Sequence, residues 1–408
     1  MSIEKNSTIE QSRNMPKGDA QSIPKGWVET TLGGVADIKY GKDHKKLNNG
    51  NIPCLGSGGI MRLVNEVLYD KPSVLIPRKG TLSNLFYIDK PFWTVDTLFY
   101  TEIDENFIIP KYLFFKLKTI KLEDLNVGSA VPSLTTVVLN QLPITIPKSI
   151  KEQKAIAQIL TAFDDKIELL QVQNKTLETT AQTIFKEWFG KYQIGDELPE
   201  GWRVGKLREV VKKISKGTTP RKKDLEGLKV EIPFLKVKDI SNEGLILKDN
   251  LELIPKKIHQ NQLKRSILET NDILFSIAGT IGRVSIVNKE LNNSNCNQAL
   301  AFIRLKDKNK FKEYVRLWFK SKEIQGEINN CIVQGVQANI SLTVLGNLAI
   351  NIPNDIKMTE WNNLSKPIYQ KIETNNAQTQ FLKQTRDMLL PKLMSGQLRV
   401  DEFKERAV

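Results

Sequence analysis

The sequence predicts a mixed α/β protein: two copies of one domain, separated by a long antiparallel helical coiled coil, in a pseudo-two-fold internal repeat. Three observations support this fold class. A heptad pattern of apolar residues follows the first predicted domain, a second copy of that pattern lies near the C-terminus, and short motifs of the first half recur in the second half. A repeat of this kind defines the architecture before any single element is assigned.

The first long helix is predicted over residues 150–192, and it carries a narrow apolar seam. No Gly or Pro lies between Ser149 and Phe189, so the backbone favours one continuous helix. An ordinary amphipathic helix on a globular core is the alternative, but such a helix usually has a wider apolar face. The seam residues alternate steps of three and four, as a and d positions do: Leu160, Phe163, Ile167, Leu170, Asn174, Leu177, Ala181, Ile184 and Trp188.

A second copy of the seam lies in a helix predicted over residues 356–400 and supplies the partner that so narrow a seam needs. Its middle is more polar than that of the first seam, and Pro367 interrupts the start of the helix. We expect the two helices to pack antiparallel, seam against seam. The second seam consists of Ile368, Ile372, Asn375, Thr379, Leu382, Leu389 and Leu393.

The regions before the two helices also repeat one another. The opening IPKGW at residues 23–27 returns as LPEGW at 198–202, and Gly80-Thr81 returns as Gly279-Thr280. We therefore predict domains over residues 23–149 and 193–355, a disordered tail over 1–22 and a C-terminal tail over 401–408. Strands are predicted at residues 74–76, 85–88, 98–103, 232–237, 273–277, 284–287 and 299–305, and short helices at 111–117 and 312–319.

Composition indicates a polyanionic partner. The chain has 60 Lys and Arg against 46 Asp and Glu, a net charge of +14, which favours nucleic acid first and an anionic membrane second. No apolar run approaches a membrane span, and the N-terminal residues lack the hydrophobic centre of a signal peptide. The three cysteines are scattered and odd in number, as expected for free thiols in a reducing cytoplasm.

The same composition leaves few means of catalysis. Only two histidines are present, and neither lies near a cysteine pair, so a metal site is not expected. We find no Walker loop, no Gly-rich cofactor loop and no Asp-Pro-Pro-Tyr-like tetrapeptide of an amino-methyltransferase. We therefore expect no catalytic residue, and no cofactor bound by this chain.

Two basic stretches at equivalent positions are predicted to contact phosphates. For a single lysine, a solvated surface charge is the more ordinary interpretation. A matched pair of basic loops in duplicated domains favours phosphate contact instead. The stretches contain Lys39, Tyr40, Lys42, Lys45 and Lys46 in the first domain, and Lys212, Lys213, Lys216, Thr218, Thr219, Arg221, Lys222 and Lys223 in the second.

Base recognition needs side chains that present two groups in one plane, chiefly Arg, Asn and Gln. The alternative for an Asn or Gln in a turn is that it satisfies its own backbone. Candidates are Arg78, Lys79, Thr81 and Asn84 in the first domain, and Arg283, Asn295, Asn297, Gln298, Gln334 and Gln337 in the second.

Taken together, these stretches resemble the specificity (S) subunit of Type I restriction–modification systems, from about residue 23 to residue 400. The most specific segments are KEQKAIAQIL at 151–160, IFKEWF at 184–189, KGTTPRKK at 216–223, NDILFSIAGTIGRVSIV at 271–287 and LLPKLMSGQLRV at 389–400. The second helix lacks a run like KEQKAIAQIL at its start, so we expect the docking of a partner subunit at that end to be weaker or altered.

The resemblance implies a subunit of a host-defence complex that has no catalytic centre of its own. Each domain would be a target-recognition domain for one half of a bipartite DNA sequence. The helices would dock two modification (methyltransferase) subunits, and restriction (translocase/nuclease) subunits would join them. S-adenosylmethionine, ATP and magnesium would be bound by those partners. The alternative function is a free-standing, sequence-specific DNA- or RNA-binding regulator.

Overall fold

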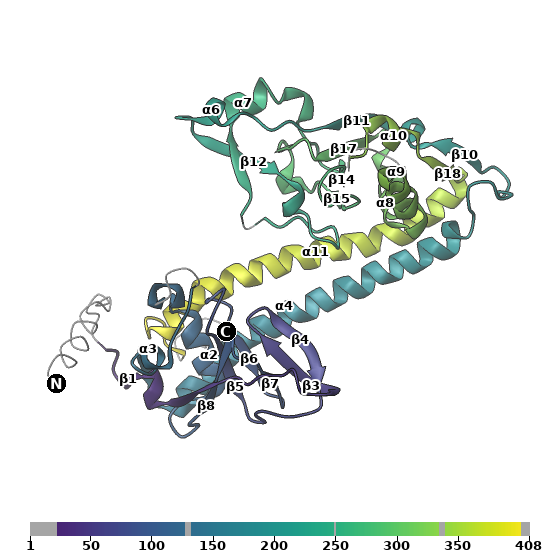
Figure 1. Cartoon of the computed structure of the whole chain (residues 1–408). Helices are drawn as coiled ribbons and strands as arrows, with labels where there is room; N and C mark the ends of the chain where they lie inside the picture. Colours follow the sequence, from purple (N-terminus) through teal and green to yellow (C-terminus); the bar gives the residue numbers. More distant parts are fainter. Residues whose placement is uncertain (1–22, 127–131, 249, 334–338, 401–408) are drawn as a thin grey trace. The chain divides into compact units, whose positions relative to one another are not determined.

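The computed structural model describes residues 23–126, 132–248, 250–333 and 339–400, so the two predicted tails lie outside the described residues. The chain divides into two compact units, one formed by Met1–Leu170 with Ala377–Val408 and the other by Gln171–Asn376. Both divisions fall inside long helices (Figure 1). Each unit therefore combines one globular domain with part of each helix.

The first domain contains three small sheets. A two-stranded sheet pairs β1 with β9, a four-stranded sheet has the order β2-β8-β5-β6, and a three-stranded sheet has the order β4-β3-β7. The strands are β1 (Trp27–Thr31), β2 (Ala36–Tyr40), β3 (Asn49–Gly56), β4 (Gly59–Val64), β5 (Ser73–Pro77), β6 (Phe86–Ile88), β7 (Trp93–Thr94), β8 (Leu98–Ile103) and β9 (Pro143–Pro147). The helices are η2 (Leu32–Gly34), α2 (Pro110–Lys118), η3 (Leu122–Leu125) and α3 (Thr136–Asn140).

The second domain repeats this plan strand for strand. Its sheets have the orders β10-β18, β11-β17-β14-β15 and β13-β12-β16. The strands are β10 (Arg203–Lys206), β11 (Val211–Lys216), β12 (Val230–Leu235), β13 (Glu252–Pro255), β14 (Ile273–Ser276), β15 (Val284–Ile286), β16 (Asn295–Cys296), β17 (Leu300–Leu305) and β18 (Ala349–Ile352). The helices are α5 (Leu207–Val210), α6 (Lys222–Leu225), η5 (Val237–Asp239), α7 (Lys256–Gln260), η6 (Lys264–Ser266), η7 (Lys289–Leu291), α8 (Lys308–Lys320), α9 (Lys322–Val333) and α10 (Leu342–Asn347).

The matching sheet orders confirm the internal repeat that the sequence predicts. In both domains the central strand of the three-stranded sheet pairs in parallel with a two-residue strand, β3 with β7 and β12 with β16. The second domain is longer between β13 and β14, where it holds α7 and η6, and it has a further helix, α9. Each predicted strand coincides with an observed one, but several other strands, such as β2, β3 and β11, were not predicted.

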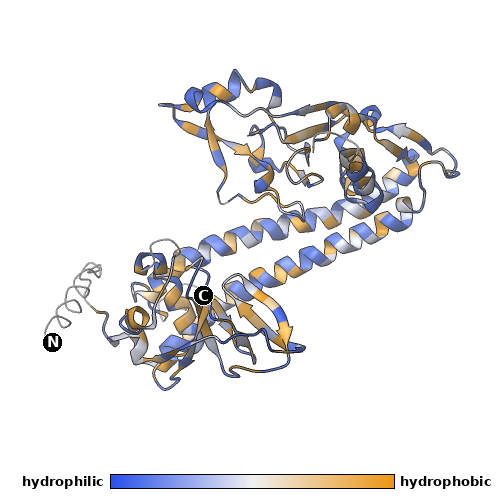
Figure 2. Ribbon diagram, in the orientation of Figure 1, coloured by the Kyte–Doolittle hydropathy of each residue, from blue (hydrophilic) through white to orange (hydrophobic). Residues whose placement is uncertain are grey.

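Each domain buries its core against the helix segments of its own unit. In the first unit Tyr112 of α2 joins a cluster that contains Leu160 and Leu393, all three fully buried. In the second unit the ring of Phe185 lies 5.4 Å from Tyr314 of α8 and 5.7 Å from Trp361. Apolar residues concentrate in the strands, whereas the long helices mix polar and apolar residues along their length (Figure 2).

The two long helices are α4 (Ile150–Phe185), followed by a π-helical turn (Lys186–Gly190), and α11 (Asp355–Met394). No predicted seam residue of either helix is exposed. In the second unit Asn174 donates to Asn376 at 2.8 Å while Phe185 contacts Trp361, so the helices there run antiparallel. Asn174 also accepts a hydrogen bond from Asn375 at 2.9 Å, which makes this part of the seam a polar contact.

One detail of the predicted second helix is wrong. Pro367 does not interrupt it, because α11 is continuous from Asp355 to Met394. A proline removes one hydrogen bond from a helix, and here the burial of Ser365, Tyr369 and the seam on the adjoining turns holds the helix together. Among the described residues, no helix is both long enough and apolar enough to cross a membrane.

Candidate nucleic-acid interface

A glycine at the end of β2 gives the first domain a tight loop, residues 40–42. The Gly41 N–H donates to the carbonyl of Leu98 at 3.2 Å, and the Lys42 N–H donates to a carbonyl of β7 at 2.8 Å. A Cβ atom on Gly41 would lie 2.1 Å from the carbonyl oxygen of Val95. Only glycine allows so close an approach of two main chains.

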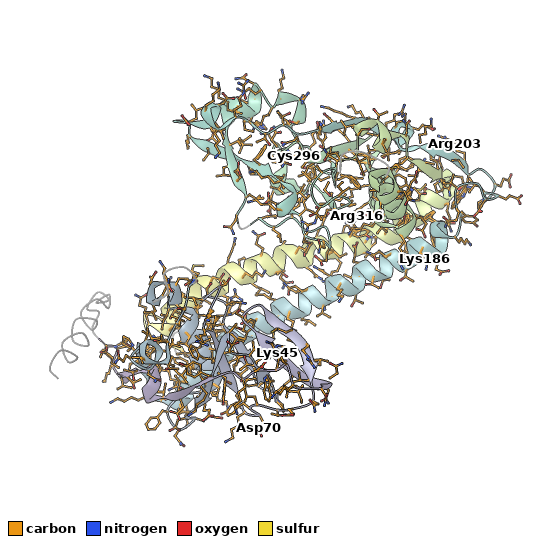
Figure 3. All side chains as sticks on the ribbon, in the orientation of Figure 1. Lys45, Asp70, Lys186, Arg203, Cys296 and Arg316 are labelled. Carbon is orange, nitrogen blue, oxygen red and sulfur yellow. The ribbon has the colours of Figure 1, made fainter. Side chains whose placement is uncertain are left out.

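The same loop occurs in the second domain at residues 216–218. The Gly217 N–H donates to the carbonyl of Leu300 at 3.2 Å, and the Thr218 N–H donates to the carbonyl of Cys296 at 3.2 Å. A Cβ atom on Gly217 would lie 1.8 Å from that Cys296 oxygen. Figure 3 labels Cys296 in this part of the second unit. We call residues 40–42 and 216–218 the glycine loops.

A second segment of main chain is also equivalent in the two domains. After β5, the Arg78 N–H donates to a carbonyl between β7 and β8 at 2.8 Å, and its own carbonyl accepts from the Leu134 N–H at 2.9 Å. After β14, Ile277 makes the same two bonds at 2.9 and 3.0 Å, the second from Ile340. Arg78 therefore corresponds to Ile277. The two domains share these main-chain hydrogen bonds, which we call the main-chain frame, but they carry different side chains at equivalent positions.

In the first domain this frame brings Tyr40 and Arg78 together. The half-exposed Tyr40 ring packs edge-on against Phe99, with ring centroids 5.0 Å apart. The Arg78 guanidinium carbon lies 5.4 Å from the centroid of the Tyr40 ring, and its Nη1 donates to the Asp96 carbonyl at 3.2 Å. A planar cation is therefore held over an aromatic face beside the glycine loop.

The turn between β3 and β4 is fixed beside this pair. The Asn84 side chain donates to the Ser57 carbonyl at 2.8 Å, and the Ser57 N–H donates to the Thr97 hydroxyl at 3.3 Å. Lys79 and Thr81 are exposed on the same segment. The predicted base-reading candidates of the first domain thus lie on adjoining loops, with Asn84 already bonded to the protein.

The lysines of the first domain differ in whether they are paired with acidic residues. The Lys39 ammonium lies 3.2 Å from an Asp37 oxygen and 3.8 Å from a Glu102 oxygen. The hydrogen bond to Asp37, with the charges of Asp37 and Glu102, raises the pKa of Lys39 above its ordinary value. Its charge is thus matched within the domain. The exposed side chains are Lys42, Lys45 and Lys46.

In the second domain part of the predicted basic loop is a strand. Lys212, Lys213 and Lys216 lie on β11, which pairs with β17 and has a bulge at its start. Val211 and Ile214 of the same strand pack on the core, and their burial favours a strand in spite of the neighbouring lysines. Lys213 donates to the Arg265 carbonyl at 2.7 Å and lies over the Phe302 ring, so it is not a free phosphate contact.

The loop begins at Gly217, as the short run of Thr and Pro predicts. The Thr219 hydroxyl hydrogen-bonds to the exposed Gln298 side chain, which adjoins the glycine loop. Beyond it, the single-turn helix α6 begins at Lys222. The exposed basic side chains here are Lys212, Lys216, Arg221, Lys222 and Lys223.

Two predicted base contacts, Asn295 and Arg283, are hydrogen-bonded within the domain. Asn295 is fully buried; its side chain accepts a hydrogen bond from the Ser266 hydroxyl and donates one to the Leu263 carbonyl. Its polar atoms are therefore used within the protein. The Arg283 guanidinium donates to the carbonyls of Val237 and Ile240 at 3.1 and 2.6 Å, which uses it to fix the chain after β12. Asn297, as its alternative interpretation foresaw, accepts from a nearby N–H of its own turn. Gln334 and Gln337 lie outside the described residues.

Arg265 is a residue that sequence reasoning missed. It is exposed, and its Nη2 donates to the Thr218 hydroxyl at 2.9 Å. It lies 47 positions from Thr218 in the sequence, inside the segment that only the second domain has. A search for basic runs passes over it, because Lys264 and Arg265 form only a pair.

Burial governs the protonation of two of the cysteines. Burial raises the pKa of the Cys296 thiol to about 12 and also raises that of Cys54, so both stay protonated at neutral pH. The three cysteines are free. Within the described residues, no group of three or more His, Cys, Asp or Glu could hold a metal ion.

Part-buried charges attach the second domain to the helix segments of its unit. The Glu178 carboxylate on α4 lies 2.9 Å from Lys320 and 3.4 Å from Arg316, both on α8. The Arg316 guanidinium, labelled in Figure 3, also stacks on Tyr369 of α11 at 3.5 Å. Burial alone would raise the pKa of Glu178, but the two cations outweigh it and hold that pKa below its ordinary value.

The first domain uses different contacts at the corresponding place. Lys116 of α2 donates to the Met394 carbonyl at 2.9 Å, and burial lowers its pKa to about 8. Arg386 of α11 lies 2.6 Å from Asp164 of α4, and both side chains are partly exposed. The two domains thus share a frame but differ in how they are attached to the helices.

Comparison with known proteins identifies the class to which this frame belongs. The family described as "Type I restriction modification DNA specificity domain" matches residues 24–179 and 199–385, one match for each half of the repeat. The chain belongs to this family. The two matches each include a domain and most of the helix that follows it, in agreement with the duplicated fold.

Individual relatives extend over most of the chain. The MjaIX specificity subunit of a Type I restriction enzyme from Methanocaldococcus jannaschii is 28% identical over 355 residues, 82% of this chain and 80% of that protein. The HindI specificity subunit from Haemophilus influenzae is 23% identical, covering 73% of this chain and 79% of its own length. The crystal structure of a Type I S subunit from M. genitalium has the same fold, with a TM-score of 0.61, 16% identity and coverage of 92% of this chain and 97% of that one.

Proposed function

We propose that this chain is the DNA sequence-recognition subunit of a Type I restriction–modification complex, and that each domain reads one half of a bipartite target. One observation carries the proposal. The two domains share a hydrogen-bonded main-chain frame around the glycine loops, yet they mount different polar side chains on it. A constant frame with variable side chains is what two readers of different sequences require.

The charge distribution supports DNA as the ligand. Exposed lysines and arginines adjoin the glycine loop in each domain, and the whole chain carries a net charge of +14. Cations of this kind hold phosphates without regard to sequence, whereas side chains with fixed planes read base edges. Each domain has both kinds of group beside one loop.

The helices would dock the modification subunits. With their seams buried, α4 and α11 still expose large apolar side chains elsewhere on their surfaces: Leu169, Phe381 and Met388 in the first unit and Val172 in the second. Exposed apolar residues on paired helices favour a protein partner. In this proposal two modification subunits bind there, restriction subunits join the assembly, and those partners bind S-adenosylmethionine, ATP and magnesium.

The test is methyl transfer with and without a partner. Purified chain, labelled S-adenosylmethionine and duplex DNA should yield no labelled DNA until the modification subunit encoded beside it is added. Transfer by the chain alone would contradict a non-catalytic role. A chain that binds its site tightly alone and does not copurify with a methyltransferase would favour the free-standing regulator instead.

A further inference from the structure

One arginine lies beside the glycine loop in each domain. In the first domain the Arg78 guanidinium lies over the ring of Tyr40, the residue before Gly41, at 5.4 Å. In the second, Arg265 Nη2 donates at 2.9 Å to the hydroxyl of Thr218, the residue after Gly217. Both guanidinium groups are therefore supported by a side chain of the loop itself.

The two arginines reach this position by different routes. Arg78 occupies the main-chain position that Ile277 occupies in the second domain, where the side chain is buried. Arg265 comes from η6, in the longer segment between β13 and β14. Duplication alone does not place a guanidinium at both loops, because the two residues are not copies of each other.

The main chain beneath each arginine is held firmly. Arg78 makes two hydrogen bonds of the shared frame, and the Arg265 carbonyl accepts from Lys213 at 2.7 Å. The next residue, Ser266, is fully buried and donates to Asn295 at 2.8 Å. An arginine fixed in this way loses less conformational entropy on binding than a free surface lysine.

We propose that Arg78 and Arg265 are the specificity-determining arginines of the two domains, each reading a guanine in the major groove through O6 and N7. The inference rests on the proposed function and adds the residue and the base. A guanidinium carries five N–H donors, and one hydrogen bond to Asp96 or Thr218 leaves enough for a two-bond contact. Guanine is the base that offers two acceptors to such a fork.

The experiment uses Arg78→Lys and Arg265→Lys in the full chain, assembled with its modification subunits. Lysine keeps the charge and loses the two-bond fork. Methylation is measured on a library with every base at every position of both half-sites. Each variant should lose about 10-fold or more of its guanine preference at one position of one half-site, with the other half unchanged.

Matched substitutions separate base reading from charge and folding. Arg62→Lys in the first domain changes an arginine held by Leu47 and Asn49, and Arg203→Lys in the second changes an exposed arginine paired with Glu209. Neither should alter base preference. Tyr40→Leu and Thr218→Val keep the arginines and remove their supports. These two variants should weaken base preference at the same target positions as the matching arginine variants. Thermal unfolding checks that each variant is folded.

Three outcomes would overturn the inference. Unchanged base preference in both arginine variants, with a bipartite preference in the parent complex, refutes the arginine assignment and leaves the proposed function intact. An even loss of affinity across all sequences would mean that the arginines hold phosphates. A parent complex with no sequence preference at all would refute the proposed function as well.

Discussion

The two domains are alike in main chain and unlike in almost everything that faces outward. Gly41 and Gly217 make the same hydrogen bonds, but Tyr40 and Lys42 flank the first, whereas Lys216 and Thr218 flank the second. The fold therefore holds these loops through hydrogen bonds between main-chain N–H and C=O groups. Because those groups are independent of side-chain identity, the recognition surface can change without loss of the frame.

The attachment to the helices differs in the same way. The second domain uses a cluster of part-buried charges around Glu178, whereas the first uses Lys116 and the neutral side chain of Gln153 on α4, which bonds to Ile109 and Phe107. A part-buried charge that loses its partner costs more than a neutral side chain that loses a hydrogen bond. The two units should therefore respond differently to equivalent substitutions.

The largest expected effect comes from exchanging a whole domain. Replacing residues 23–147 with those of a relative of different specificity should change one half of the recognised sequence and leave the other half intact, because each domain has its own core. Methylation mapped on a target library measures this. A change in both halves would show that the domains do not read independently.

The next effect concerns Glu178. Glu178→Gln removes the carboxylate that Lys320 and Arg316 share, leaves Arg316 with Glu313 alone, and should destabilise the second unit by about 3 kcal/mol. Asp164→Asn in the first unit should cost less than about 1 kcal/mol. Hydrogen exchange read by peptide reports each unit separately. Equal effects on the two units would contradict the difference in attachment.

The stability of the second unit should also depend on pH through Glu178. Because the folded chain holds the pKa of Glu178 below its ordinary value of 4.5, the carboxylate stabilises the second unit above that value. This contribution is lost as pH falls through the pKa in the folded state. The parent chain should lose stability over this range more steeply than the Glu178→Gln variant, and parallel curves would argue against the interpretation.

A smaller loss of stability is expected at the glycine loops. Gly41→Ala and Gly217→Ala each force a Cβ against a carbonyl oxygen, and each should destabilise its own domain by about 2 kcal/mol. Gly58→Ala is the control, because a Cβ there meets nothing within 4 Å. Chemical unfolding of the variants measures the difference. Tolerance of alanine at both loops would mean that the shared frame is not tight.

The smallest effect should come from the phosphate contacts. Replacing Lys212, Arg221, Lys222 and Lys223 with Gln should weaken DNA binding evenly across sequences and lower its salt dependence, by about 0.9 in log–log slope for each lost contact. Lys39→Gln should change little, because Lys39 is already paired with Asp37 and Glu102. Titrations at several salt concentrations decide this, and a shift in sequence preference would assign these residues to base reading.

The sequence alone determined the repeat, both long helices and the residues of their seam. These features depend on spacing along the chain: a side chain at an a or d position lies on one helix face wherever the helix is placed. The equivalence of the two basic loops was also readable from their positions in the repeat, whereas the close main-chain approach at their glycines was not. The strands β2 and β11 were missed because their lysines were interpreted as parts of basic loops.

Which polar side chains remain available to a ligand was decided only by the tertiary structure. Asn295 and Arg283 match the residue types that read bases, yet long-range packing buries the first and binds the second to carbonyls from distant segments. Arg265 lies in no motif and still reaches Thr218 across 47 positions of sequence. Burial and contact between such segments arise from how the sheets pack, which local spacing does not encode.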